Sequence, residues 1–68
     1  MKSKFSQNIC MFRNQMGLTQ QELADGVGVS QKSIDYWEKD RYEPKLSSLV
    51  KLAKFFGVTI DYLVGLED

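Results

Sequence analysis

The chain has 68 residues, 43% of them hydrophobic and 26% charged, and its nine Lys and Arg residues balance nine Asp and Glu residues; this suits one domain, expected over residues 1–68, and argues against a large undirected basic surface. The sequence has no His and a single Cys, Cys10, which excludes the usual general acid–base residue, a Cys/His zinc site and a disulfide within the chain. Because no apolar run approaches the roughly 20 residues that span a bilayer, we expect a cytoplasmic binding protein without metal or cofactor, not an enzyme or a membrane protein.

Apolar residues recur at helical spacing between regularly placed glycines, which predicts an all-α fold of five short helices. The first covers residues 5–16, and its inward stripe is formed by Phe5, Ile9, Phe12 and Met16. Gly17 follows this helix and can take the left-handed conformation that ends one.

The second helix begins after Thr19, which can cap it while Glu22 completes a capping box, and it ends at Gly28. Gly26 lies inside this helix, where glycine costs about 0.5–1 kcal/mol relative to alanine, and a close backbone contact is the one reason we find for it. Ser30 caps the third helix. Asp40 is placed to end it, because Asp tolerates the left-handed region.

The fourth helix covers residues 46–56, and its inner face is formed by Leu46, Leu49, Leu52, Ala53 and Phe56. Gly57 ends it. Thr59 then caps a fifth helix over residues 60–64, which Gly65 ends.

Phe55 falls on the side of the fourth helix opposite its inner face, so we expect this ring to be exposed. Tyr62 and Leu66 follow nearby in the sequence. Together the three residues predict an apolar surface for a homodimer, formed through the fifth helix and the tail of residues 66–68.

The turn Gly28-Val29-Ser30 joins two short helices, as in a helix-turn-helix motif, here over about residues 19–39. Any small helical bundle needs short turns, so the turn alone is also compatible with two packed helices that have no DNA role.

On the third helix, Ile34 and Trp37 point to one side, opposite a polar face formed by Lys32, Asp35, Tyr36 and Lys39, with Gln31 and Ser33 on its flanks. A recognition helix presents such side chains to the major groove, where Gln pairs with adenine and Lys donates to guanine. A solvated helix face is equally polar. Asp35 could accept from cytosine, hold Lys32 or Lys39 in place, or weaken DNA binding on this face.

Phosphate contacts are expected on both sides of the third helix. Gln20 lies in the first turn of the second helix, where free backbone N–H groups favour a phosphate. On the far side, Lys39, Arg41 and Lys45 are placed to contact the other strand. Residues 30–45 contain as many anions as cations, the anions being Asp35, Glu38, Asp40 and Glu43, so their zero local charge weakens the electrostatic attraction.

The order of residues resembles the Cro/phage-repressor type of helix-turn-helix regulator over roughly residues 5–65. The resemblance is carried in one frame by Phe12-Arg13, Gly17-Leu18-Thr19-Gln20-Gln21-Glu22-Leu23-Ala24, Gly28-Val29-Ser30, Ile34, Trp37-Glu38, Pro44, Leu49, Leu52-Ala53 and Gly57-Val58. It implies a five-helix DNA-binding domain that acts as a dimer on operators with two-fold symmetry.

By position, the resemblance implies that Gln20 contacts phosphate, that Arg41 and Tyr42 meet the DNA backbone, and that bases are read by Gln31, Lys32 and Tyr36, with contributions from Ser33 and Asp35. Arg13 and Glu38 match positions that brace the helices through hydrogen bonds. The sequence departs from the family pattern at three positions, which are Asp40, Lys45 and Gly26.

Two functions follow. The first is a transcriptional repressor that binds double-stranded operator DNA as a homodimer. The second is a protein-interaction module, such as an antirepressor, that keeps the fold without tight DNA binding. Gln20, Gln31 and Lys32 favour the first, and the neutral charge and Asp35 favour the second.

Overall fold

Five helices form the regular structure of residues 3–66, the part of the chain that the computed structural model describes. They are α1 (Lys4–Gln15), α2 (Gln20–Val27), α3 (Gln31–Glu38), α4 (Leu46–Phe56) and α5 (Ile60–Val64). The predicted all-α fold is confirmed, and the predicted ranges agree to within one residue. The ends of the expected domain and its tail, residues 1–2 and 67–68, lie outside the described residues.

Local hydrogen bonds explain where the helices begin. The capping box of α2 is confirmed: Thr19 Oγ1 accepts from the Glu22 backbone N–H at 3.1 Å, and the Thr19 N–H donates to Glu22 Oε1 at 2.9 Å. Ser30 and Thr59 cap α3 and α5 in the predicted way. The cap of α1, Ser3, was not predicted.

The ends of the helices also follow local chemistry. Gly28, directly after α2, takes a positive φ angle of 87°, and Asp40, two residues after the end of α3, takes one of 59°. The prediction that Asp40 occupies the left-handed region is therefore confirmed. At the start of α4, Lys45 occupies the cap position without a side-chain hydrogen bond to the helix.

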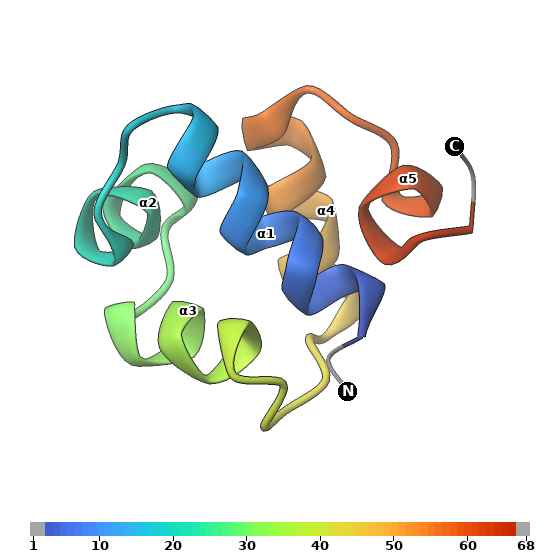
Figure 1. Cartoon of the computed structure of the whole chain (residues 1–68), viewed down its shortest axis with the longest axis horizontal. Helices are drawn as coiled ribbons and strands as arrows, with labels where there is room; N and C mark the ends of the chain where they lie inside the picture. Colours follow the sequence, from blue (N-terminus) through green and yellow to red (C-terminus); the bar gives the residue numbers. More distant parts are fainter. Residues whose placement is uncertain (1–2, 67–68) are drawn as a thin grey trace.

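The core lies where α1 crosses the middle of the molecule, packed on α3 at one side and α5 at the other, while α4 packs on α2 and α5 (Figure 1). Its buried apolar residues are Phe5, Ile9, Leu23, Ala24, Val27, Ile34, Trp37, Leu52, Ala53 and Leu63. Burying each large aliphatic side chain contributes about 1.5–3 kcal/mol. None of the described helices is long and apolar enough to cross a membrane.

Two residues expected on inward faces are exposed instead. Met16 lies beyond the last residue of α1 and is 50% exposed. Leu46 is the first residue of α4, and it is 70% exposed. Both stand at a helix end, where the chain has left the core or has not yet entered it.

Packing against Phe55 explains why a glycine stands at position 26, inside α2. A Cβ atom built on it would lie 2.5 Å from Cε1 of Phe55, so the missing side chain lets the Phe55 ring lie against the backbone of α2. The expectation that Phe55 is exposed is therefore wrong, because this ring is half-buried and packs against the core. The close contact suggested for Gly26 is confirmed.

Candidate nucleic-acid interface

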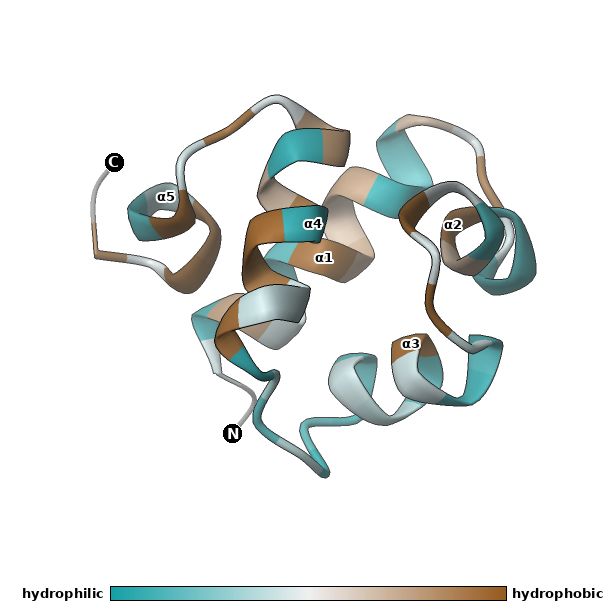
Figure 2. Cartoon of the chain, turned by 180° about the vertical axis from the view of Figure 1, so that it is seen from behind, coloured by the Kyte–Doolittle hydropathy of each residue, from teal (hydrophilic) through white to brown (hydrophobic). Residues whose placement is uncertain are grey.

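Helix α3 lies at one edge of the molecule, joined to α2 by the short turn at Gly28–Ser30 (Figure 1). Ile34 and Trp37 are buried, as predicted, and fix which side of α3 faces the core. Most of this helix carries residues of hydrophilic or neutral hydropathy (Figure 2). The outward face is thus available for contact with another molecule.

Gln20 and Gln31 meet at the junction of the two helices. Gln31 Nε2 donates to Gln20 Oε1 at 2.8 Å, and Gln20 Nε2 donates to Asp35 Oδ1 and Glu38 Oε1, each at 3.2 Å. These bonds hold the Gln31 amide at the N-terminal end of α3 and the Gln20 amide along the side of that helix. Two residues expected to have different DNA contacts are therefore joined in one network.

Glu38 is turned away from this outward face, toward α1. Arg13 Nε donates to Glu38 Oε2 at 2.6 Å, Arg13 Nη2 donates to Glu38 Oε1 at 3.1 Å, and Arg13 Nη1 donates to the Leu18 carbonyl at 2.9 Å. The hydrogen bond to Glu38 raises the pKa of Arg13 further above its usual range. The bracing role implied for this pair matches the geometry, and Glu38 adds little charge to the surface because it is buried.

Asp35 forms an ion pair with Lys39, the residue that directly follows α3. Lys39 Nζ lies 2.9 Å from Asp35 Oδ2, one helical turn further on. Hydrogen bonds from Lys39 and then from Gln20 lower the pKa of Asp35 below its usual range. Of the roles considered for Asp35, the structure shows the one in which it holds Lys39.

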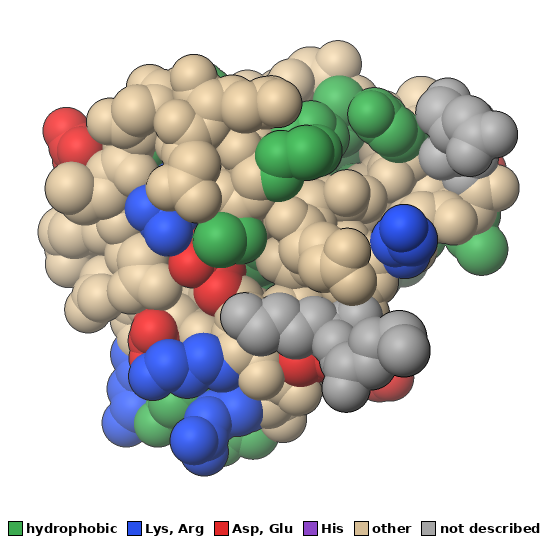
Figure 3. All heavy atoms as spheres, in the orientation of Figure 1, with side chains coloured by type: hydrophobic (Ala, Val, Ile, Leu, Met, Phe, Trp, Pro, Cys, Tyr) green, Lys and Arg blue, Asp and Glu red, His purple; other side chains and the backbone are tan. Residues whose placement is uncertain are grey.

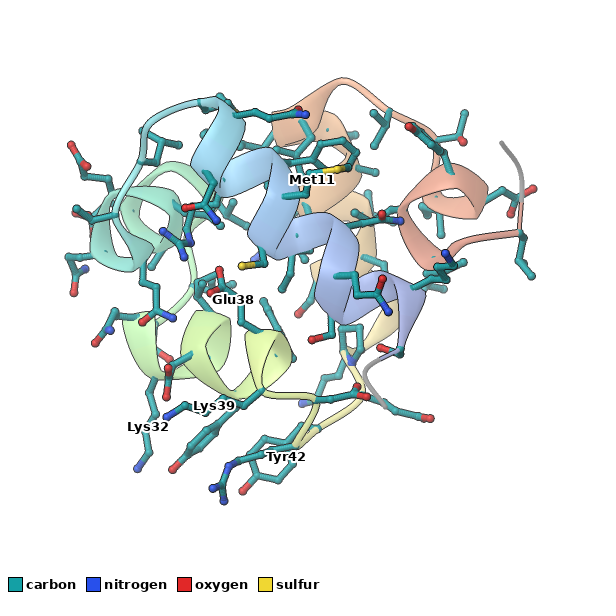
Figure 4. All side chains as sticks on the ribbon, in the orientation of Figure 1. Met11, Lys32, Glu38, Lys39 and Tyr42 are labelled. Atoms are coloured by element: carbon teal, nitrogen blue, oxygen red, sulfur yellow. The ribbon has the colours of Figure 1, made fainter. Side chains whose placement is uncertain are left out.

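Three side chains on the outward side contact one another in sequence: Lys32, Tyr36 and Tyr42. Lys32 Nζ lies 5.5 Å above the ring centroid of Tyr36. The rings of Tyr36 and Tyr42 meet edge to face, with centroids 5.1 Å apart and planes 74° apart. Lys32, Lys39 and Tyr42 extend from the same side of the molecule, while Glu38 points inward (Figure 4).

The remaining predicted contacts have simpler surroundings. The Ser33 hydroxyl is 2.9 Å from that of Ser30, at the cap of α3. Arg41 is exposed, and its backbone N–H donates to the Tyr36 carbonyl at 2.9 Å. Lys45 is exposed at the start of α4.

Basic side chains gather over α3 and the loop that follows it (Figure 3). The exposed cations in this part of the chain are Lys32, Lys39, Arg41 and Lys45. Among the anions of residues 30–45, Glu38 is buried and paired with Arg13, Asp35 is paired with Lys39, and Asp40 and Glu43 are exposed. Beyond these pairs, the exposed cations Lys32, Arg41 and Lys45 face two exposed acids, so the zero net charge of the segment hides a small positive excess at its surface.

One contact that positions this loop has no signal in the sequence. Asp40 accepts hydrogen bonds from the backbone N–H of Ser3 at 2.8 Å and from its hydroxyl at 2.9 Å. Two exposed polar residues 37 positions apart carry no periodicity that would pair them. The bond ties the loop after α3 to the start of α1.

The three residues expected at a dimer interface are not equally exposed. Phe55 is turned toward α2, and Tyr62 is half-buried, with its ring 6.0 Å from that of Phe12. Leu66 is 77% exposed. A dimer surface at this end of the molecule stays a prediction.

Comparison with known proteins shows which family the sequence matches. The model of the helix-turn-helix family HTH_3 matches residues 11–63. The chain is 43% identical over 61 residues to the cryptic phage CTXphi transcriptional repressor RstR of Vibrio cholerae, covering 90% of this chain and 55% of RstR. It is 37% identical over 65 residues to the transcriptional activator BcrR of Enterococcus faecalis, covering 96% of this chain and 32% of BcrR.

A solved structure shares the fold over almost its whole length. The P22 c2 repressor, crystallised with a synthetic operator, superimposes with a TM-score of 0.86 at 30% identity, covering 93% of this chain and 96% of that one. In contrast, the chain spans about a third of BcrR and about half of RstR.

Proposed function

Because the chain belongs to the helix-turn-helix family HTH_3, we propose that it is a transcription regulator that binds double-stranded DNA and reads an operator in the major groove with α3. The observation that carries this proposal is the gathering of basic side chains over α3 and the loop after it, together with the linked amides of Gln20 and Gln31 where α2 meets α3. Acidic Glu38 is withdrawn into the core from the same segment.

Each part of the face has a role in this proposal. Gln31 and Lys32 lie in the first turn of α3, the part of a recognition helix that reaches base edges, and they pair with adenine and guanine. Tyr36 extends the base-reading face. The backbone N–H groups at Gln20, in the first turn of α2, and the Arg41 side chain contact phosphates on opposite sides of α3, and Lys39 is oriented for phosphate by Asp35.

The regulatory outcome that we propose is repression by a homodimer. RstR is named as a repressor and the P22 c2 repressor was crystallised with an operator, whereas BcrR is named as an activator. A domain that contributes one recognition helix and occupies an operator blocks the access of other proteins to the same DNA. Apart from the dimer contact, repression therefore requires no surface other than the one that binds DNA.

The test begins with selection of bound sequences from a random duplex pool, which yields an operator. Affinity for that operator should fall steeply between 50 and about 200 mM salt, because bound phosphates release counterions. The double variant Gln31→Ala/Lys32→Ala should lose its preference for the operator over random duplex while its helix content by circular dichroism stays unchanged.

Negligible binding to every duplex at low salt would refute the proposal and favour a protein-interaction module with the same fold. Retained preference in the double variant would refute only the assignment of these two side chains as base readers.

A further inference from the structure

Tyr42 lies outside the recognition helix, yet its ring packs on a residue of that helix. The ring is 62% exposed, so burial in the core does not explain its position. The Tyr42 ring meets the Tyr36 ring edge to face, with 5.1 Å between the two ring centroids. Edge-to-face pairs are favoured because the positive ring edge meets the negative ring face.

The loop that carries Tyr42 is held in place from two sides. The N–H of Arg41, the residue before it, donates to the Tyr36 carbonyl at 2.9 Å. Asp40 accepts both hydrogen bonds from Ser3 and so ties the loop to the start of α1. The Tyr42 ring therefore meets Tyr36 from an anchored backbone.

Tyr36 in turn supports Lys32. The two residues are one helical turn apart, and the Lys32 ammonium lies 5.5 Å above the Tyr36 ring. A lysine side chain is flexible and has three donors. One side of the ammonium faces the ring, which leaves its other N–H groups directed away from the ring and available to acceptors.

The cation that directly follows α3 is differently engaged. Lys39 is paired with Asp35 at 2.9 Å, which fixes its position one turn further along the helix. Lys32 is thus the cation that an aromatic ring positions near the N-terminus of α3, on the side that points away from the molecule (Figure 4).

Resting on the proposed function, we infer that Tyr42 is a positioning residue for base recognition: it fixes Tyr36, which holds the Lys32 ammonium ready to donate to the O6 and N7 acceptors of one guanine. This differs from a direct phosphate contact by the Tyr42 hydroxyl. Preorganising a flexible donor improves discrimination because less conformational freedom is lost at the correct base pair than with a free side chain.

The two roles predict different behaviour. A positioning ring is needed for discrimination between base pairs, and its hydroxyl is dispensable. A phosphate contact contributes equally to every sequence and depends on the hydroxyl. The informative quantity is the ratio of affinities for the selected operator and for the same operator with its guanine replaced by adenine.

The experiment measures this ratio for the 68-residue chain and its variants by fluorescence anisotropy. The guanine to replace is found with the Lys32→Ala variant. It is the guanine whose replacement by adenine no longer lowers the affinity of that variant. Tyr42→Ala should reduce the ratio by about threefold to tenfold, the range expected for one aromatic contact. Tyr42→Phe keeps the ring and should rescue the wild-type ratio.

Two controls make the assignment specific. In a Lys32→Ala background, Tyr42→Ala should reduce the ratio no further, since coupled residues are non-additive. Arg41→Ala, at the neighbouring exposed cation, should instead weaken binding equally for both duplexes. Circular dichroism melting of each variant shows whether the fold is retained.

Three results would overturn the inference while leaving the proposed function intact. They are an unchanged ratio in Tyr42→Ala, an equal loss of affinity for both duplexes in that variant, and a loss in Tyr42→Phe as large as that in Tyr42→Ala. Absence of binding to any duplex by the wild-type chain would refute the proposed function and this inference with it.

Discussion

The Arg13–Glu38 pair determines how much negative charge the α3 face presents. Both side chains are largely buried, at 16% and 8% exposure, and the pair is joined by two hydrogen bonds. Removing one partner of such a pair leaves the other charge buried and typically costs about 3–5 kcal/mol. Glu38 is thus a structural residue on a helix whose other side faces outward.

Glu22 provides a prediction about pH. The backbone N–H of Thr19 and then its side chain bind the Glu22 carboxylate and lower its pKa below the usual 4.5. A lowered pKa means that this stabilisation is fully present above about pH 4.5 and is lost as the pH falls through the folded-state value. The melting temperature of the wild-type chain should therefore drop between pH 5 and about pH 3.

Glu22→Gln keeps a capping side chain but cannot titrate, so this variant should show a smaller drop in melting temperature over the same range. Glu43→Gln removes the same charge at an exposed acid outside the capping box and is the control. An equal drop in the wild type and in Glu22→Gln would show that the capping box does not contribute to acid sensitivity.

At the scale of elements, the contact between α2 and α4 depends on one missing side chain. Gly26→Ala would place a methyl group 2.5 Å from the Phe55 ring. The gain in helix propensity of about 0.5–1 kcal/mol is opposed by an overpacking cost of about 1–3 kcal/mol. We expect a net loss of stability, measured by urea denaturation.

A smaller side chain at position 55 provides the matched test. In a Phe55→Leu background, Gly26→Ala should be neutral or stabilising because the clash with the ring is removed. If Gly26→Ala alone stabilises the chain, the Phe55 ring moves aside at little cost and the packing explanation for Gly26 is wrong.

At the scale of the whole molecule, size connects the fold to operator symmetry. The described domain measures 27 × 25 × 23 Å, whereas neighbouring half-sites on one side of DNA are about 34 Å apart. Under the proposed function, one domain with one recognition helix therefore reads one half-site. An operator with two-fold symmetry requires two copies, and an isologous pair is the simplest arrangement.

Leu66 allows the proposed homodimer to be tested. Wild-type protein should sediment as a dimer at high micromolar concentration, and Leu66→Lys should weaken the dimer about tenfold or more, because burying a leucine is worth about 1.5–3 kcal/mol. Leu46→Lys, at a leucine with similar exposure at the start of α4, should leave the dimer unchanged. A monomeric wild type, or identical behaviour of the two variants, would contradict an interface at Leu66.

The positions of the five helices could be predicted from the amino-acid sequence, because the signals that begin and end a helix are local. The capping box at Thr19 and Glu22, and the left-handed residues Gly28 and Asp40, act over three or four positions and need no tertiary partner. The polar face of α3 followed in the same way from helical periodicity. Family resemblance added the bracing role of Arg13 and Glu38.

Which polar and apolar side chains reach the surface depends on how the helices pack against one another. The tertiary structure buries Glu38 against Arg13, packs Phe55 on Gly26, pairs Asp40 with Ser3 and places Tyr42 on Tyr36. Each of these contacts joins different helices or loops, so neither spacing nor composition encodes it. The zero net charge illustrates the difference, since a sum over residues contains no information about which charges are buried, paired or exposed.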